Sequence, residues 1–481
     1  MKLKKVAALV LAGAMTVSLA ACGGSSSSTT TNSTNEGGTT QQENAAGEEV
    51  AEEGIKSYAE IDLDSDFKDL TTTITFFSNR TDMEEGMDYP GKDWPAYLAD
   101  FNELYPNITV NIRTSTEYDT ELTNALPSGT YDTITCIRNM DKADLSTYYM
   151  SYGDYDTISQ TINYAENSMY DGQVYGIAST ANAGGIVYNK KVFEEAGITE
   201  IPKTPDEFIA ALQQIKDNCP GVIPLYTNYT AGWALSGQWD AYIGIASTGD
   251  TEYKNQKMSH TQDPFKDYGD DTHPYAVYKI LYDAVAQGLT EDDYTTTDWE
   301  GSKPMMNNGE IGCMVLGSWA LPQMKLAGDN PDDVGYMAFP ITVDGVQYAA
   351  ASADSGYGIN VNATDDEKQA ALIFVKWLVE RSGYAYNEYS LPVVKGAETQ
   401  LSFDGVELIE EEPAIAGEED LRDKISAESE VNIDLDGNGL RLAAVIEHAA
   451  NGDMTYDDIV AGWNQAWSDA QESLGVEVTE E

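Results

Sequence analysis

The chain has 481 residues, and its 81 acidic against 27 basic side chains give a formal net charge of −54. We expect no nucleic-acid partner, because binding to phosphates needs clustered lysine and arginine, and anionic ligands are disfavoured for the same reason. The length suits two large domains, and a hydrophobic content of 42% can supply their cores.

Residues 1–21 have the pattern of a signal peptide. Three lysines among the first five residues precede an apolar run over residues 6–20, shorter than the about 20 residues of a membrane-spanning helix. The run ends in Leu19-Ala-Ala-Cys22, which resembles the bacterial lipobox. The resemblance implies lipidation of Cys22 and an anchor on the extracellular face of the cell membrane. An ordinary secretory leader with a chance cysteine is the alternative.

Residues 22–57 are predicted to form a disordered tether. Serine, threonine, glycine, asparagine and glutamine dominate the segment, and four glutamates stand near its end. Such a composition buries too little apolar surface to fold and favours a flexible linker.

Strand and helix signals alternate beyond the tether. Residues 73–77 read as a buried strand, residues 94–105 as a helix that Pro106 ends, and residues 108–112 as a second strand. This alternation predicts an α/β protein. Three capping patterns mark further helix starts: Thr204 with Glu207, Thr364 with Glu367 and, more weakly, Thr455 with Asp458.

The cysteines and histidines give no sign of a metal site. No C-x-x-C occurs, so we expect Cys136, Cys219 and Cys313 to be small buried side chains, with a Cys219–Cys313 bridge left open. The three histidines lack metal-ligand spacing. We therefore expect no cofactor.

Residues 434–439 resemble the start of an EF-hand calcium loop. Position 12 of such a loop would be Val445, where a bidentate glutamate is needed. A turn is the better interpretation, and whether an ion binds near Asp434 and Asn438 stays open.

Several soft motifs follow one another along most of the chain. They lie at residues 105–110 (YPNITV), 171–177 (DGQVYGI), 184–198, 202–208, 310–319, 356–360 and 463–467. In this order and spacing they resemble the extracellular solute-binding proteins of ABC importers, in the family that includes maltose-binding protein.

The resemblance implies an α/β protein with the two-lobed periplasmic-binding-protein (Venus flytrap) fold, each lobe a mixed sheet flanked by helices. The N-terminal lobe would comprise residues 58–179 with 358–390, and the C-terminal lobe residues 180–357 with 391–478. A hinge would cross between them near residues 179–184, 354–358 and 387–393.

The resemblance also implies a binding function without catalysis. The protein would be a monomeric substrate-binding lipoprotein that captures its ligand between the lobes and delivers it to ABC permease subunits. The 8 tryptophans and 30 tyrosines could stack on sugar rings, so we interpret the ligand as a neutral sugar, specifically an oligosaccharide. The same fold binding a cation, a polyamine or a peptide is one alternative. A surface-anchored carbohydrate-active enzyme is another, because acid pairs are abundant, although no nucleophile or phosphate motif appears.

Ligands of open α/β sheets bind beyond the carboxyl ends of the strands, so residues that follow predicted strands are candidates. In the first lobe, Asn79, Arg80 and Asp82 follow residues 73–77, and Asn139 follows residues 133–137. The alternative for this first loop is a solvated Arg80–Asp82 pair.

The second lobe and the hinge supply mainly aromatic candidates. They are Trp233, Trp239 and Asp240 after the strand at 223–225, Trp319 after the strand at 311–316, and Asp354 and Tyr357 beside a crossing. At least one of Trp233 and Trp239 should be core, since tryptophan is mostly buried. Trp299 is a weaker candidate, while helical spacing assigns Trp377, Trp463 and Trp467 to the core.

Overall fold

The computed structural model describes residues 54–479, except positions 88, 90, 116, 139, 404, 416 and 419. The predicted signal peptide, Cys22, the tether up to residue 53 and Asn139 therefore lie outside the described residues. The chain divides into two units, residues 1–52 and 53–481, and every element below belongs to the second. Within the described ranges, no helix combines the length and apolar character needed to cross a membrane.

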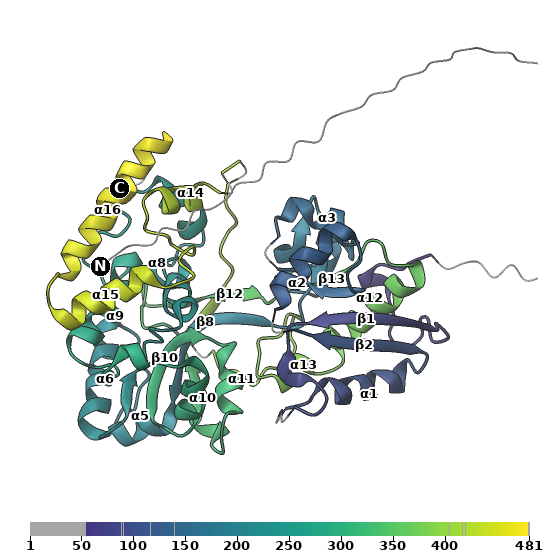
Figure 1. The fold of residues 1–481 in the computed structure, drawn as a ribbon, viewed down its shortest axis with the longest axis horizontal. Coiled ribbons are helices and arrows are strands. Elements are labelled where there is room, and N and C mark those ends of the chain that lie inside the picture. Colours follow the sequence, from purple (N-terminus) through teal and green to yellow (C-terminus); the bar gives the residue numbers. More distant parts are fainter. Residues whose placement is uncertain are drawn as a thin grey trace, which may run out of the picture. The chain divides into compact units, whose positions relative to one another are not determined.

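The first sheet has the strand order β2-β1-β3-β13-β7, of which β1, β2 and β13 are labelled in Figure 1. Its strands are β1 (Thr72–Ser78), β2 (Ile108–Thr114), β3 (Ile134–Cys136), β13 (Tyr357–Ile359) and β7 (Gly176–Ile177). β1 pairs in parallel with β2 and β3, whereas β13 is antiparallel to β3 and β7. The two strands predicted around residues 73–77 and 108–112 are confirmed.

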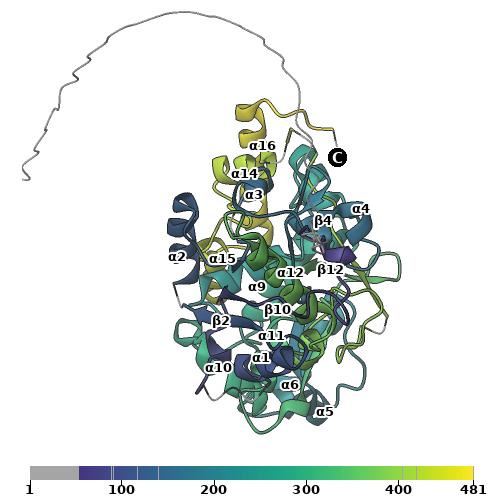
Figure 2. The same cartoon turned by 90° about the vertical axis from the view of Figure 1, so that its right-hand side faces the viewer.

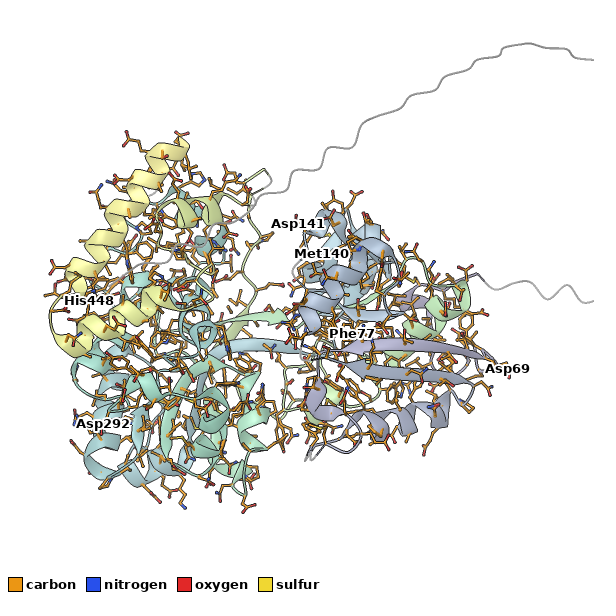
Figure 3. The ribbon with its side chains drawn as sticks, in the orientation of Figure 1. Asp69, Phe77, Met140, Asp141, Asp292 and His448 are labelled. Atoms are coloured by element: carbon orange, nitrogen blue, oxygen red, sulfur yellow. The ribbon has the colours of Figure 1, made fainter. Side chains whose placement is uncertain are left out.

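Aromatic packing holds helices on both faces of this sheet. Phe76 of β1 lies 5.6 Å from Trp94 and 6.1 Å from Phe374 between ring centroids. These partners come from α1 (Trp94–Leu104) and α12 (Asp365–Glu380), which lie beside β1 and β2 in Figures 1 and 2. The next side chain, Phe77 (Figure 3), packs 4.1 Å from Tyr118 of α2 (Tyr118–Ala125). A strand covered on both faces explains the continuous apolar run in the sequence.

The second sheet has the order β14-β12-β8-β10-β9, with β11 also paired to β8. Its strands are β8 (Ala181–Asn189), β9 (Ile223–Leu225), β10 (Ile311–Gly317), β11 (Val334–Met337), β12 (Gln347–Ala353) and β14 (Val406–Ile409). β10 is parallel to β9 and antiparallel to β8, and every residue of β10 is buried. Both sheets are therefore mixed, as the predicted α/β fold requires.

Helices around the second sheet carry most of the remaining core. They are α5 (Lys190–Ala196), α6 (Pro205–Asn218), α7 (Gln238–Asp240), α8 (Ile245–Thr248), α9 (His273–Ala286), α10 (Trp299–Asn307), α11 (Ala320–Lys325), α14 (Leu421–Glu428), α15 (Leu440–Asn451) and α16 (Tyr456–Leu474). The other described elements are α3 (Leu145–Tyr148), α4 (Tyr155–Ile158), α13 (Tyr384–Asn387) and a small sheet of β4 (Gly153–Asp154), β6 (Gln173–Val174) and β5 (Met169–Tyr170).

The three predicted helix starts are present as hydrogen-bonded caps. The side chains of Thr204, Thr364 and Thr455 each accept from the backbone N–H three residues later. Trp377 and Trp467 are buried as predicted, whereas Trp463 is half-buried against Phe265 and Tyr278.

The chain passes between the two sheets near the predicted crossings. β7 ends at Ile177 before β8 begins at Ala181, and β12 ends at Ala353 before β13 begins at Tyr357. Leu391 then exchanges backbone hydrogen bonds of 2.7 and 3.2 Å with Ala181 before the chain continues to β14. Leu391 and Val393 belong to the hydrophobic core around the first sheet. Both lie just after residue 390, where the N-terminal lobe was predicted to end.

The cysteines and the EF-hand-like segment have structural roles. Cys136, Cys219 and Cys313 are free and buried, so Cys219 and Cys313 form no bridge. Residues 433–435 form a turn, as predicted. The Asp434 carboxylate there pairs with Lys254 at 3.0 Å and Arg422 at 3.3 Å. Among the described residues, no group of three or more histidine, cysteine, aspartate or glutamate side chains could hold a metal.

Candidate ligand-binding site

A cavity of 740 Å³ lies where strands of both sheets end, a volume typical of small-molecule sites. The loop after β1, the two connections between the sheets, and the segments after β10 and α13 all contribute to its wall. The lining includes Asn79, Arg80, Asp82, Tyr89, Cys136, Ser179, Thr180, Glu300, Lys303, Trp319, Asp354, Tyr357, Tyr384 and Glu388.

Arg80 is the centre of a polar network in the wall. Its Nε and Nη2 donate to the two carboxylate oxygens of Asp82, each at 2.9 Å. Nη2 also donates to Glu388 Oε2 at 2.9 Å, and Nη1 donates to the Tyr384 hydroxyl at 3.0 Å. The Arg80–Asp82 pair considered from the sequence is therefore present, but as part of the cavity wall.

Glu388 brings a buried carboxylate to this network. The residue is 2% exposed, and its Oε2 accepts from both Arg80 and the Tyr89 hydroxyl. Its Oε1 is enclosed and has no hydrogen-bond partner among the residues that the structure describes. Burial opposes the charged form of Arg80, but Tyr384, Asp82 and Glu388 outweigh that effect and raise the pKa of Arg80 well above its usual value. The guanidinium therefore stays charged and fixed in place.

The connections between the sheets supply the floor of the cavity. The Tyr357 hydroxyl lies 2.9 Å from Ser179 Oγ, and the Asp354 N–H donates to the Thr180 carbonyl at 2.9 Å. Burial raises the pKa of the Cys136 thiol to about 12, with a smaller contribution from the charge of Asp354. This thiol therefore stays protonated and unreactive in the folded protein.

Three tryptophans meet on the opposite wall. Trp319 lines the cavity, and its indole N–H donates to Gln238 Oε1 at 3.3 Å. Trp233 and Trp299 lie 5.8 and 5.7 Å from Trp319 between ring centroids, and 5.2 Å from each other. Trp233 is 44% exposed, whereas Trp299 is partly buried beneath Lys303. The wall thus carries an aromatic surface held by its neighbours.

Comparison with known proteins identifies the architecture. Residues 85–385 match the family model described as bacterial extracellular solute-binding protein. The chain belongs to this family. The resemblance found in the sequence motifs is therefore confirmed, together with the two-lobed fold.

Individual relatives of this solute-binding protein refine the comparison. It is 26% identical over 326 residues to the multiple sugar-binding protein of Streptococcus mutans, covering 65% of this chain and 72% of that one. Two solved structures from Bifidobacterium animalis subsp. lactis are each 49% identical and cover 87% of this chain and 99% of theirs. One is the manno-oligosaccharide specific solute binding protein BlMnBP2 in complex with mannotriose, with a TM-score of 0.77. The other, BlMnBP1, is an ABC transporter's binding protein in complex with mannobiose, with a TM-score of 0.78.

Most residues predicted for the site lie together at the cavity of this solute-binding protein. Its lining includes Asn79, Arg80, Asp82, Trp319, Asp354 and Tyr357. Trp233 lies beside Trp319, at the outer edge of the aromatic surface. Asn139 lies outside the described residues.

Trp239 and Asp240 do not line the cavity, contrary to prediction. Trp239 is 2% exposed and packs on Phe339, while Asp240 is fully buried. Asp240 forms an ion pair with Arg441 and accepts from the Tyr278 hydroxyl at 2.7 Å. The segment after β9 folds into a helical turn and α7, which direct these side chains into the core. Position after a strand alone could not reveal this turn.

Sequence reasoning missed Glu388 and Tyr89 altogether. Glu388 belongs to the predicted crossing at 387–393 and lines the cavity. A carboxylate within a predicted hinge segment was therefore the signal that could have identified it as a site residue. Tyr89 stands in an irregular loop with no periodic pattern, and its hydrogen bonds with Glu388 and with Arg80, the latter of 3.0 Å, identify it.

Proposed function

We propose that this chain is the substrate-binding lipoprotein of an ABC importer and that its cavity binds a manno-oligosaccharide. The observation that supports the ligand is the 49% identity, over 87% of this chain, to a binding protein solved with mannotriose. The cavity suits such a ligand, because carboxylates and amides bind hydroxyls while a tryptophan face packs on pyranose C–H groups.

The proposed contacts divide between the walls. Asn79, Arg80 and Asp82 bind hydroxyls from one side, Asp354 and Tyr357 from the floor, and Trp319 stacks on a sugar ring. Arg80 suits this role because its partners already fix the guanidinium, so binding immobilises little further. Trp233 extends the stacking surface, and Asn139 remains a candidate from its position after a strand.

Transport requires that ligand binding change the protein. We propose that the two lobes close on the sugar, since only the closed state contacts it from both sides. The lobes comprise residues 58–179 with 358–390 and residues 180–357 with 391–478. The closed monomer then presents the sugar to the permease and leaves it uncleaved. Lipidation at Cys22 holds the protein at the extracellular face of the membrane beside that permease.

Calorimetric titration of the purified protein tests the ligand. Mannobiose and mannotriose, in α- and β-linked forms, are compared with maltotriose and cellobiose. We expect saturable binding of at least one manno-oligosaccharide and an increase in melting temperature by mass action. Absence of binding to every manno-oligosaccharide would refute the proposal. Release of reducing ends during prolonged incubation would instead indicate an enzyme.

Metabolic labelling with a radioactive fatty acid tests the anchor. The wild-type protein should incorporate label and sediment with membranes, whereas the Cys22→Ala variant should do neither. Equal labelling of the two would overturn lipidation at Cys22 without affecting the ligand proposal.

A further inference from the structure

The charged groups around the cavity are unequal in number. Among the described residues that line it, Arg80 and Lys303 are cationic, against four carboxylates. The carboxylates are Asp82, Glu300, Asp354 and Glu388. Counting each as ionised, two positive and four negative charges leave a formal charge of −2 on the lining.

Both cations are already engaged by carboxylates of the same wall. Asp82 holds Arg80 through two bonds of 2.9 Å and Glu388 through a third of the same length. Lys303 Nζ donates to both oxygens of Glu300 at 2.9 Å and lies 5.0 Å from the centre of the Trp299 ring. The described part of the lining therefore offers a ligand no uncompensated positive charge.

Negative charge, in contrast, is left uncompensated. Asp354 has no ion-pair partner in the part of the chain that the structure describes, and its Oδ1 accepts only from the Ser355 N–H at 2.7 Å. Its charge reaches Tyr357: burial and the neighbouring Cys136 raise the pKa of Tyr357, and Asp354 adds to that rise, while the Ser179 hydrogen bond and Arg80 oppose it. Among the described residues, Glu388 Oε1 also has no partner, but this oxygen is enclosed. Asp354 is therefore the carboxylate left to accept from a ligand.

We propose that this cavity selects neutral and amine-bearing oligosaccharides and rejects those that carry uronic acids. The inference rests on the proposed function and adds charge selection at the same site. Hydroxyl and ammonium groups donate to the Asp354 carboxylate, and neutral side chains such as Asn79 bind the remaining oxygens. A uronate carboxylate meets like charge and no free cation, an arrangement that disfavours a ligand by repulsion.

A matched pair of sugars tests the inference. β-1,4-Mannobiose and dimannuronate share one backbone and differ in the oxidation state of C6. Titration at low salt should show dimannuronate binding at least about tenfold more weakly. Raising the salt concentration to about 1 M shortens the Debye length to about 3 Å. This screening should improve dimannuronate binding and so reduce the difference in affinity between the two sugars.

Variants locate the source of the discrimination. Asp354→Asn keeps the shape and removes the charge, so it should improve the affinity for dimannuronate relative to mannobiose by severalfold. Asp292→Asn is the control, because Asp292 is exposed and absent from the cavity lining (Figure 3). This control variant should keep the wild-type ratio of the affinities for dimannuronate and mannobiose.

The outcomes separate this inference from the proposed function. Equal affinity for the two sugars, or an unchanged ratio in Asp354→Asn, would overturn charge selection while mannobiose binding stands. Failure of every neutral manno-oligosaccharide to bind would reject the proposed function, and the inference with it.

Discussion

Arg80 Nη2 donates a 2.9 Å hydrogen bond to Glu388 Oε2, joining two residues that are 308 positions apart in the sequence. Arg80 follows the first strand of the first sheet, and Glu388 follows α13 on the return from the second sheet. The bond therefore joins the segment after β1 to the segment after α13 at the wall of the cavity. If the proposed function holds, ligand recognition and the stability of this part of the fold depend on the same ion pair.

Glu388→Gln should weaken both properties. The substitution removes a buried negative charge that faces Arg80, and we expect unfolding to become easier by about 1–3 kcal/mol. Affinity for the manno-oligosaccharide should fall because Arg80 is held less firmly. Chemical denaturation and titration measure the two effects. Glu407→Gln, on β14 and outside the cavity lining, is the control, and wild-type behaviour of Glu388→Gln would contradict the role given to the pair.

Trp319→Ala should weaken sugar binding by roughly 10- to 100-fold, since it removes the aromatic face that lines the cavity. Trp319→Phe retains a flat ring and should lose less. Because Trp319 is only partly buried, both variants should remain folded by circular dichroism. Unchanged affinity in Trp319→Ala would remove this residue from the site.

Asp240→Asn should act on stability and leave recognition intact. It breaks a fully buried ion pair with Arg441, a change that typically costs about 3–5 kcal/mol. At temperatures where the variant is folded, its affinity for sugar should match that of the wild type. A selective loss of affinity with normal stability would return Asp240 to the binding site.

His260 should make the attachment of the C-terminal segment depend on pH. Its Nδ1 lies 2.7 Å from the Glu477 carbonyl oxygen and its Nε2 lies 3.0 Å from a Glu418 carboxylate oxygen. Partial burial disfavours the charged ring, but these two acceptors outweigh it and raise the pKa of His260.

Because the pKa of His260 is raised in the folded protein, the attachment of the C-terminal segment should weaken as pH rises. The stabilisation is complete below the ordinary pKa of histidine, about 6.5, and is lost as pH rises through the higher pKa of the folded protein. Hydrogen exchange should show residues 476–479 losing protection over that window. His260→Gln should remove the dependence, whereas a pH-dependent loss that persists in this variant would assign it to another group.

Buried thiols should resist alkylation in the folded protein. Cys136, Cys219 and Cys313 are all buried, and burial raises the pKa of Cys136 to about 12. Iodoacetamide at neutral pH should modify these residues only after denaturation, as mass spectrometry of digested protein can determine. Rapid modification of Cys136 in the native protein would show that the cavity floor opens.

Local patterns located the elements of this fold well. The apolar run around Phe76 marked β1, and the caps at Thr204 and Thr364 marked α6 and α12, because each depends on residues a few positions apart. The rule that ligands bind beyond strand ends brought Asn79, Arg80 and Trp319 to one cavity. The same rule failed for Trp239 and Asp240, since the segment after β9 forms a helical turn and α7, in which both side chains are buried.

The sequence by itself determined the α/β class, the order of the elements and the family, because hydrophobic period, capping and motif spacing are local properties of the chain. Only the tertiary structure decided which side chains share the cavity. Glu388 reaches Arg80 because the chain returns to the first sheet, at β13, after building most of the second sheet. Among the described residues, Arg80 and Lys303 are paired with carboxylates and Asp354 is not, and this difference depends on distances between remote segments, which no local pattern encodes.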